Sequence, residues 1–92
     1  MGVDETATET KIQLQPNPAI NDFSFSINLK QTSEVKILIH DLSGRLMISN
    51  SYGQLEAGQH LLSQTVSDLT TGVYMVSIKY NNGILTSRLM VE

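Results

Sequence analysis

The sequence predicts an all-β protein, an immunoglobulin-like antiparallel β-sandwich of about seven strands. Lys and Glu are few, while Ser, Thr, Asn, Gln and β-branched residues are common, which favours sheet over helix. Apolar and polar residues alternate with a period of two, and turn signals recur about every 8–12 residues. No segment shows a sustained helical period. The chain has no Cys and no Trp, so it lacks the pattern of antibody domains.

Length and charge exclude several classes of protein. The 92 residues suffice for one domain and are too few for two. The net charge is -3 and the six basic residues are scattered, so neither nucleic acid nor an anionic membrane surface is an expected partner. The absence of Cys excludes disulfides and thiolate metal sites. No apolar run approaches the ~20 residues that span a bilayer, and any signal peptide would belong to a longer precursor.

The start of the chain differs from the remainder. Residues 1–10, MGVDETATET, are polar and acidic and show no periodicity. Such a segment is typical of a disordered linker, or of residues added so that a domain can be expressed alone. We therefore expect one ordered domain over residues 11–92.

The first expected strand covers residues 11–15, with Ile12 and Leu14 on its inward side. Pro16-Asn17-Pro18 ends it, because two prolines remove two backbone donors and are tolerated only at an edge or a turn. The clearest strand covers residues 22–30, where four apolar side chains face one way: Phe23, Phe25, Ile27 and Leu29.

Two further strands flank a central turn. Residues 35–40 place Val35, Ile37 and Ile39 inward, and Leu38 on the other face indicates a strand that is partly covered on both sides. Residues 41–45, DLSGR, form a turn in which Gly44 is free to take a positive φ. Residues 46–51 continue as strand.

The second half contains a bend, a strand and a hairpin. Gly53 and Gly58 bracket the bend, and residues 59–66 form a strand with Leu62 and Val66 inward. Gln64 lies between them, which the pattern does not explain. Residues 67–72 form a tight polar connection with room for a single helical turn. Residues 73–80 and 84–91 then pair across Asn82-Gly83, the strongest hairpin signal in the chain, with four side chains on the inward face: Tyr74, Val76, Ile78 and Tyr80.

The chain shows no catalytic or metal-binding pattern. His40 and His60 are the only histidines, and we interpret both as ordinary surface or rim residues. No spacing resembles HExxH or another zinc motif, and no segment has the acidic rhythm of a calcium loop. A nucleophile, a base and an orienting group are not recognisable together. We expect no enzyme activity, no catalytic residues, no cofactor and no metal.

Two alternatives from other functional classes remain open. A carbohydrate-binding module needs exposed aromatic rings to stack on sugars, and here only Tyr52 is left for that role. A passive immunoglobulin-like or fibronectin-like accessory module of a secreted enzyme would bind nothing.

Three blocks of sequence resemble a known family. They are LQPNPAINDFSFSI over residues 14–27, VKILIHDLSGRLM over residues 35–47, and LTTGVYMVSIKYNNGILTSRLMV over residues 69–91. Their order and spacing are similar to those of the C-terminal sorting domain of the type IX secretion system, the Por secretion system sorting domain of Bacteroidetes. The resemblance covers residues 11–92. His40, Arg88 and Glu92 depart from the residues usual in that family.

The resemblance implies a secretion signal attached to a larger cargo protein upstream. The cargo would be exported through the periplasm to the cell surface or the medium. Its partners would be the translocation machinery and a surface sortase that cleaves near the start of the domain, where residues 1–10 would suit a protease. Strand addition at an exposed sheet edge is one physically reasonable mode of recognition.

The resemblance also points to residues for partner recognition. The PNP residues set the angle at which the chain enters the domain, the DLSGR residues shape the central turn, and the last hairpin presents the final strand. Each Gly and Pro can instead serve only its turn. Arg45 and Arg88 are expected to contact a partner, because neither a turn nor a strand requires a cation. The complete set is Pro16, Asn17, Pro18, Asp41, Gly44, Arg45, Gly72, Tyr74, Gly83, Arg88, Leu89, Met90 and Val91.

Overall fold

The computed structural model describes residues 12–81 and 83–92, which form six antiparallel strands and no helix. The predicted linker over residues 1–10, Lys11 of the first expected strand and Asn82 of the hairpin turn lie outside the described residues. The prediction of an all-β fold is confirmed, with six strands in place of about seven. The strands are β1 (Asp22–Leu29), β2 (Ser33–Asp41), β3 (Leu46–Leu55), β4 (Gly58–Thr65), β5 (Gly72–Tyr80) and β6 (Gly83–Val91).

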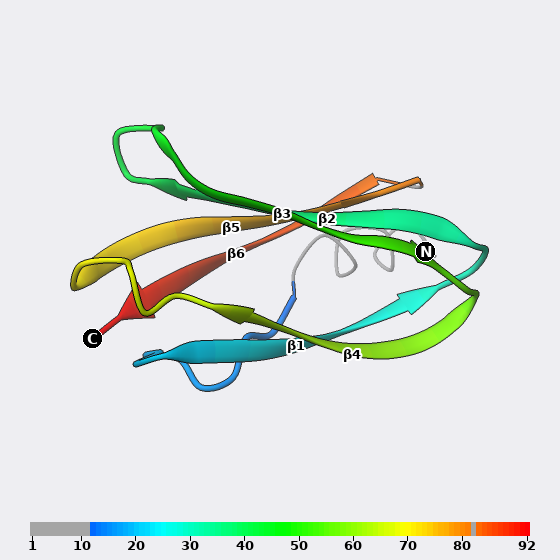
Figure 1. Cartoon of the computed structure of the whole chain (residues 1–92), viewed down its shortest axis with the longest axis horizontal. Helices are drawn as coiled ribbons and strands as arrows, with labels where there is room; N and C mark the ends of the chain where they lie inside the picture. Colours follow the sequence, from blue (N-terminus) through cyan, green and yellow to red (C-terminus); the bar gives the residue numbers. More distant parts are fainter. Residues whose placement is uncertain (1–11, 82) are drawn as a thin grey trace, which may run out of the picture.

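The strands form two sheets that face each other (Figure 1). One sheet has four strands in the order β3-β2-β5-β6, and the other pairs β1 with β4. All neighbouring strands are antiparallel. The strand order agrees with two packed layers, while the immunoglobulin-like topology remains a prediction.

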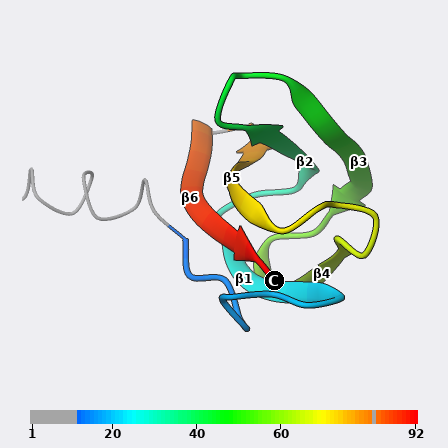
Figure 2. The ribbon, with the colours of Figure 1, turned by 90° about the vertical axis from the view of Figure 1, so that its left-hand side faces the viewer.

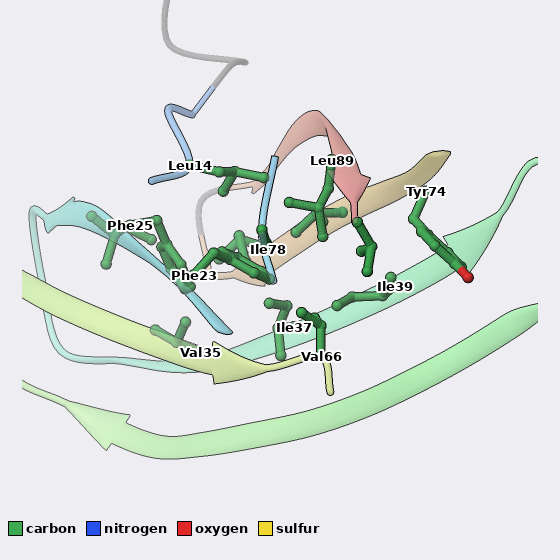
Figure 3. Packing of buried hydrophobic residues seen from close by; sticks show 14 of the residues in the cluster. Leu14, Phe23, Phe25, Val35, Ile37, Ile39, Val66, Tyr74, Ile78 and Leu89 are labelled. Carbon is green, nitrogen blue, oxygen red and sulfur yellow. The ribbon is translucent and has the colours of Figure 1, made fainter. Parts of the chain in front are cut away.

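The core lies between the two sheets, where the period-two alternation buries every second side chain (Figure 3). Every position expected to face inward on β1 and β2 is buried, and Leu38 is half-buried as predicted. Tyr80 and Leu62 are only partly buried and pack against the margin of this core. The buried cluster consists of Leu14, Ala19, Phe23, Phe25, Ile27, Leu29, Val35, Ile37, Ile39, Val66, Tyr74, Val76, Ile78, Leu89 and Val91.

The first expected strand is not a strand. Leu14 is buried as predicted, but the segment makes a single bridge, in which Gln15 pairs with Ser24 of β1. The Gln15 backbone N–H donates to the Ser24 oxygen over 3.0 Å, and the Ser24 N–H donates back over 2.6 Å. Pro16 and Pro18 follow and have no N–H to donate, so the ladder cannot continue.

Strand β3 runs four residues beyond its predicted end at Ser51, to Leu55, and contains Gly53, which was expected to open a bend. Val35 pairs with Gly53 and Lys36 pairs with Ser51, so Tyr52 is the extra residue of a β-bulge. Gly53 has a φ of 76°, which a residue with a side chain rarely adopts. The bulge redirects Tyr52 toward the other sheet.

Tyr52 joins the two sheets instead of standing on the surface. Its ring meets Phe25 edge to face at 6.0 Å, and its hydroxyl donates to the Ser63 backbone oxygen over 2.8 Å. Burial raises the pKa of this phenol to about 12. Tyr52, the aromatic residue that the carbohydrate-binding alternative required, therefore packs between the sheets and is not available to stack on a sugar.

The structure explains the position of Gln64 between Leu62 and Val66. Asn50 of β3 donates from Nδ2 to the Gln64 Oε1 over 3.1 Å, and Gln64 Nε2 donates to the Thr65 backbone oxygen over 2.8 Å. A polar side chain is tolerated at this margin because its amide is hydrogen-bonded. The connection that follows is a hydrogen-bonded turn and not a helical one, with Leu69 N–H donating to the Val66 oxygen.

Candidate functional site

Residues 15–19, which contain the PNP motif and which we call the PNP segment, lie against the outer edge of the last strand, β6 (Figure 2). Four hydrogen bonds join the two, and we call the residues that make them the terminal clasp. Asn17 Nδ2 donates to the Arg88 backbone oxygen over 3.1 Å, and Met90 N–H donates to Asn17 Oδ1 over 3.0 Å. Ala19 N–H donates to the Met90 oxygen, and Glu92 N–H donates to the Ala19 oxygen, both over 2.8 Å.

The Asn17 side chain takes the place of a neighbouring strand. Its carboxamide donates one hydrogen bond and accepts one, as a peptide group in a β-ladder does. Ala19 then forms a parallel bridge with Val91, so the pairing continues to the end of β6. The edge of β6 from Arg88 onward is therefore already occupied in the folded chain.

The same short segment connects the two sheets. Gln15 is bridged to β1, whereas Asn17 and Ala19 are bonded to β6. Leu14 fills the gap between the sheets from this side, and Ala19 is completely buried. Beside the segment lies an open hollow of about 520 Å³, lined by Ile12, Gln13, Leu14, Asn17 and Ser87. The PNP segment thus closes one side of the sandwich.

The turn over residues 41–45 is held by a single carboxylate. Asp41 Oδ1 accepts from the Ser43 backbone N–H, the Ser43 hydroxyl and the Arg45 N–H, over 3.0, 2.7 and 2.9 Å. The hydrogen bond from the Ser43 hydroxyl is the main cause that lowers the pKa of Asp41 to about 2. Gly44 has a φ of 95°, as predicted. Arg45 Nε lies 3.3 Å from Asp41 Oδ2 while its side chain is 75% exposed.

Tyr74 secures the start of β5 from inside. It is 4% exposed, and its hydroxyl donates to the Thr70 backbone oxygen over 2.7 Å. A tyrosine near the start of a strand that bonds to backbone a few residues upstream is the tyrosine corner of β-sandwiches. Gly72 precedes it and pairs with Val91, so this corner lies next to the terminal clasp.

Comparison with known protein families identifies the family of the chain. The family model described as the secretion system C-terminal sorting domain matches residues 13–92. The chain belongs to this family. No curated protein matches the chain. The family is non-catalytic, which confirms the prediction that the chain is not an enzyme, and a sorting domain implies an exported protein.

Most of the residues predicted for recognition lie at one end of the sorting domain. The 41–45 turn, the start of β5 and the end of β6 all lie at the left of Figure 1. Asp41 pairs with Tyr74, and Tyr74 pairs with Leu89. Gly83 is the exception: it pairs with Tyr80 at the opposite end of β5 and β6.

Burial divides the predicted residues of the last strand into two sets. Leu89 and Val91 are in the core with Tyr74, so they support the fold of the sorting domain and a partner cannot touch them while it is folded. Arg88 and Met90 alternate with them and are exposed, as are Pro16 and Pro18. Among residues 12–81 and 83–92 the only ion pair is that of Arg45 with Asp41, so Arg88 has no carboxylate partner there.

Two features of the site were not predicted from the sequence. Ala19 is completely buried and makes one backbone hydrogen bond to Met90 of β6 and one to Glu92, yet a single Ala after a proline carries no signal for this. Val73 and Met75 lie beside Arg88 and Met90, because β5 and β6 pair there. The pattern of residues 73–80 placed Val73 and Met75 away from the inward face, but no face was predicted for Arg88 and Met90.

Metal-ligating side chains do not cluster in the described part of the sorting domain. No three of its His, Cys, Asp or Glu side chains gather where a metal ion could be held. The Nε2 atom of His60 is 2.7 Å from the Glu56 backbone oxygen, so this ring is part of a local turn. Over the same residues no helix is long and apolar enough to cross a membrane.

Proposed function

We propose that this sorting domain is the type IX secretion signal of a larger cargo protein and is read by the translocation machinery in its folded state. The observation that carries the proposal is the terminal clasp, which joins the first and third family blocks of the sequence into one surface. A signal that needs both blocks would be presented only after folding. The machinery would thereby bind a chain whose sorting domain is folded and would not bind one whose sorting domain is unfolded.

The route and the processing step belong to the same proposal. The cargo passes through the periplasm, crosses the outer membrane and reaches the cell surface or the medium. A surface sortase then removes the domain by cutting within residues 1–10, whose polar sequence precedes the PNP segment. Cleavage there would leave the terminal clasp intact on the released domain.

Recognition at the exposed residues of this end is also part of the proposal. Arg88, Met90, Pro18 and Arg45 are available on the surface, whereas the buried members of the predicted set act by holding the last strand. The edge of β6 from Arg88 onward is bonded to Asn17 and Ala19. Strand addition at that part of the edge would first require the PNP segment to leave.

An export assay tests the proposal. The whole 92-residue chain is fused behind a periplasmic reporter in a bacterium that has a type IX system, and in the same strain without the translocation machinery. We expect the reporter at the surface or in the medium only where the machinery is present. A reporter that stays in the periplasm of both strains contradicts the proposal.

The terminal clasp provides a matched pair of variants for this assay. Asn17→Ala removes two hydrogen bonds to β6, while Gln59→Ala changes an exposed side chain of β4. If the machinery recognises the surface that includes the terminal clasp, export falls for Asn17→Ala and stays at the wild-type level for Gln59→Ala. Equal export of both would show that the PNP segment is not needed for recognition.

A further inference from the structure

The outer face of the four-stranded sheet, the side turned away from β1 and β4, carries an unusual concentration of exposed apolar side chains. Among residues 12–81 and 83–92, eight large apolar residues are exposed, and the strand pairings place four of them on this face. The four residues are Leu46, Met75, Ile84 and Met90. Met75 is 38% exposed and Met90 is 45% exposed. Leu46, Met75 and Met90 lie toward the end of this face that carries the terminal clasp, whereas Ile84 lies at the opposite end. A contiguous apolar patch on the surface of a small domain is typical of an interaction site.

A hollow lies within this face next to the terminal clasp. It has a volume of about 370 Å³ and is lined by Asn17, Pro18, Val73, Arg88 and Met90. Its walls are mainly apolar, and methionine adapts to partner side chains of different shape. The hollow can hold one large apolar side chain.

The charges on the outer face are mostly positive. Lys36, Lys79 and Arg88 are exposed on it, and Glu34 is the one acidic residue that the described strands place there. Lys36 stands directly opposite Lys79 on the neighbouring strand, an arrangement that costs stability. The chain as a whole has a net charge of -3, so this face differs in sign from the molecule. These cations are not explained by the fold.

Charge decides which occupant fits. A second copy in a face-to-face pair would bring its own cationic face against this one, and the flat surface of an anionic bilayer would leave the apolar hollow unfilled. An acidic protein segment matches both the charge and the apolar hollow. Arg88 can bind its carboxylate through two parallel hydrogen bonds.

We propose that the outer face at Val73, Met75, Arg88 and Met90 docks an extended acidic segment of a partner protein. One large apolar side chain of that segment enters the hollow beside Pro18, and an adjacent carboxylate pairs with Arg88. This inference rests on the proposed function, because it names the surface and the partner chemistry by which the sorting domain is recognised. Burial of Met90 and neutralisation of Arg88 would then occur together on binding.

Export of the reporter fusion tests this surface with four variants of the full chain. Arg88→Glu and Met90→Asp change the proposed site, and Lys30→Glu and Leu61→Asp make the same chemical changes at exposed positions outside it. We expect export to fall about tenfold or more for the first pair, because like charges then oppose each other, and to stay at the wild-type level for the second pair. Circular dichroism and thermal unfolding of each purified chain establish that it is folded.

The outcomes separate this inference from the proposed function. If the wild-type fusion is exported and Arg88→Glu and Met90→Asp are exported equally well, the docking surface is wrong and the sorting function stands. If the wild-type fusion is not exported, the sorting function is wrong, and the surface is judged by direct binding.

Direct binding uses the purified chain labelled with ¹⁵N and a blocked peptide of alternating Glu and Leu. We expect amide shifts that centre on Val73, Met75, Arg88 and Met90 and that disappear in Arg88→Glu. A blocked Lys and Leu peptide is the control and should leave those amides unmoved. Amide shifts scattered over the whole domain would overturn the inference and show that no such site exists. Shifts that change when the chain alone is diluted would show that a second copy binds this face. Equal shifts with anionic phosphatidylglycerol vesicles would show that a membrane binds it.

Discussion

In both the terminal clasp and the 41–45 turn, a side-chain oxygen accepts hydrogen bonds from backbone N–H groups. The acceptor is Asn17 in the terminal clasp and Asp41 in the turn. Asp41 bonds to residues up to four positions away, whereas Asn17 bonds to a residue 73 positions away. The turn can therefore form early and locally, while the terminal clasp exists only when the sandwich is complete. A signal built on the terminal clasp reports the folded state, and one built on the turn does not.

The largest expected effect comes from loosening β6 beneath the terminal clasp. Leu89→Ala removes a side chain with 0% exposure, and we expect the free energy of unfolding to fall by about 2–5 kcal/mol. Denaturant unfolding measures the change. The control is Leu61→Ala, since Leu61 is 75% exposed and its truncation should change stability by less than about 0.5 kcal/mol. Equal losses for both variants would place β6 outside the core.

Asn17→Ala breaks the terminal clasp itself and should have the next largest effect. It removes two hydrogen bonds at about 0.5–1.5 kcal/mol each, so we expect a loss of about 1–3 kcal/mol. Asn17→Asp keeps the acceptor for Met90 N–H but cannot donate to the Arg88 oxygen. At neutral pH its stability should lie between that of the wild type and that of Asn17→Ala. Amide exchange at Met90 and Glu92 should accelerate in Asn17→Ala. Unchanged exchange would mean that the edge of β6 does not depend on Asn17.

Acid should weaken the turn and leave the terminal clasp intact. The pKa of Asp41 is lowered from 3.8 to about 2, so the stability it contributes is present above pH 3.8 and is lost as the pH falls toward 2. Asp41→Asn retains an acceptor oxygen that cannot be protonated in this range. Thermal unfolding between pH 5 and pH 2 should show the wild type losing more stability than Asp41→Asn. Parallel curves for the two chains would contradict the lowered pKa.

The smallest effect is expected from the cation of the turn. Arg45 pairs with Asp41 at 3.3 Å, but its side chain is 75% exposed, so Arg45→Gln should cost about 0–1 kcal/mol. The difference from the wild type should shrink in 1 M salt, where exposed charges are screened. A loss that is large and independent of salt would show that Arg45 packs as well as pairs.

Residue patterns predicted the strands better than they predicted the segments between them. Phe23, Phe25 and Ile27 alternate strictly, so the buried face of β1 followed from the sequence. The expected strand at residues 11–15 was wrong, because residues 12–15 pair with β1 only at Gln15, and Pro16 and Pro18 prevent the pairing from extending beyond it. Tyr52 was expected on the surface because the pattern does not reveal a β-bulge, which adds one residue and turns the side chain toward Phe25.

The candidate site was predicted as a set of residues and not as an arrangement. Arg88 and Met90 were named correctly as part of the last strand, together with Leu89 and Val91, and the alternation of β6 then separated exposed from buried members. The partner of Asn17 could not be inferred, because a carboxamide carries no information about which distant backbone it will meet. Ala19 was missed for the same reason.

The sequence by itself determined the class of fold, the buried faces of the strands, the geometry of the 41–45 turn and the resemblance that identified the family. The buried faces and the turn depend on neighbours within a few positions, where covalent connection limits the possible contacts. The resemblance depends on the order and spacing of three sequence blocks and needs no knowledge of their contacts. Tertiary structure alone decided that the PNP segment closes the edge of β6 and that Arg88 stands beside an apolar hollow. The Asn17 hydrogen bonds to Arg88 and Met90 join residues 71 and 73 positions apart, and they form only when burial of the core brings the two ends of the domain together.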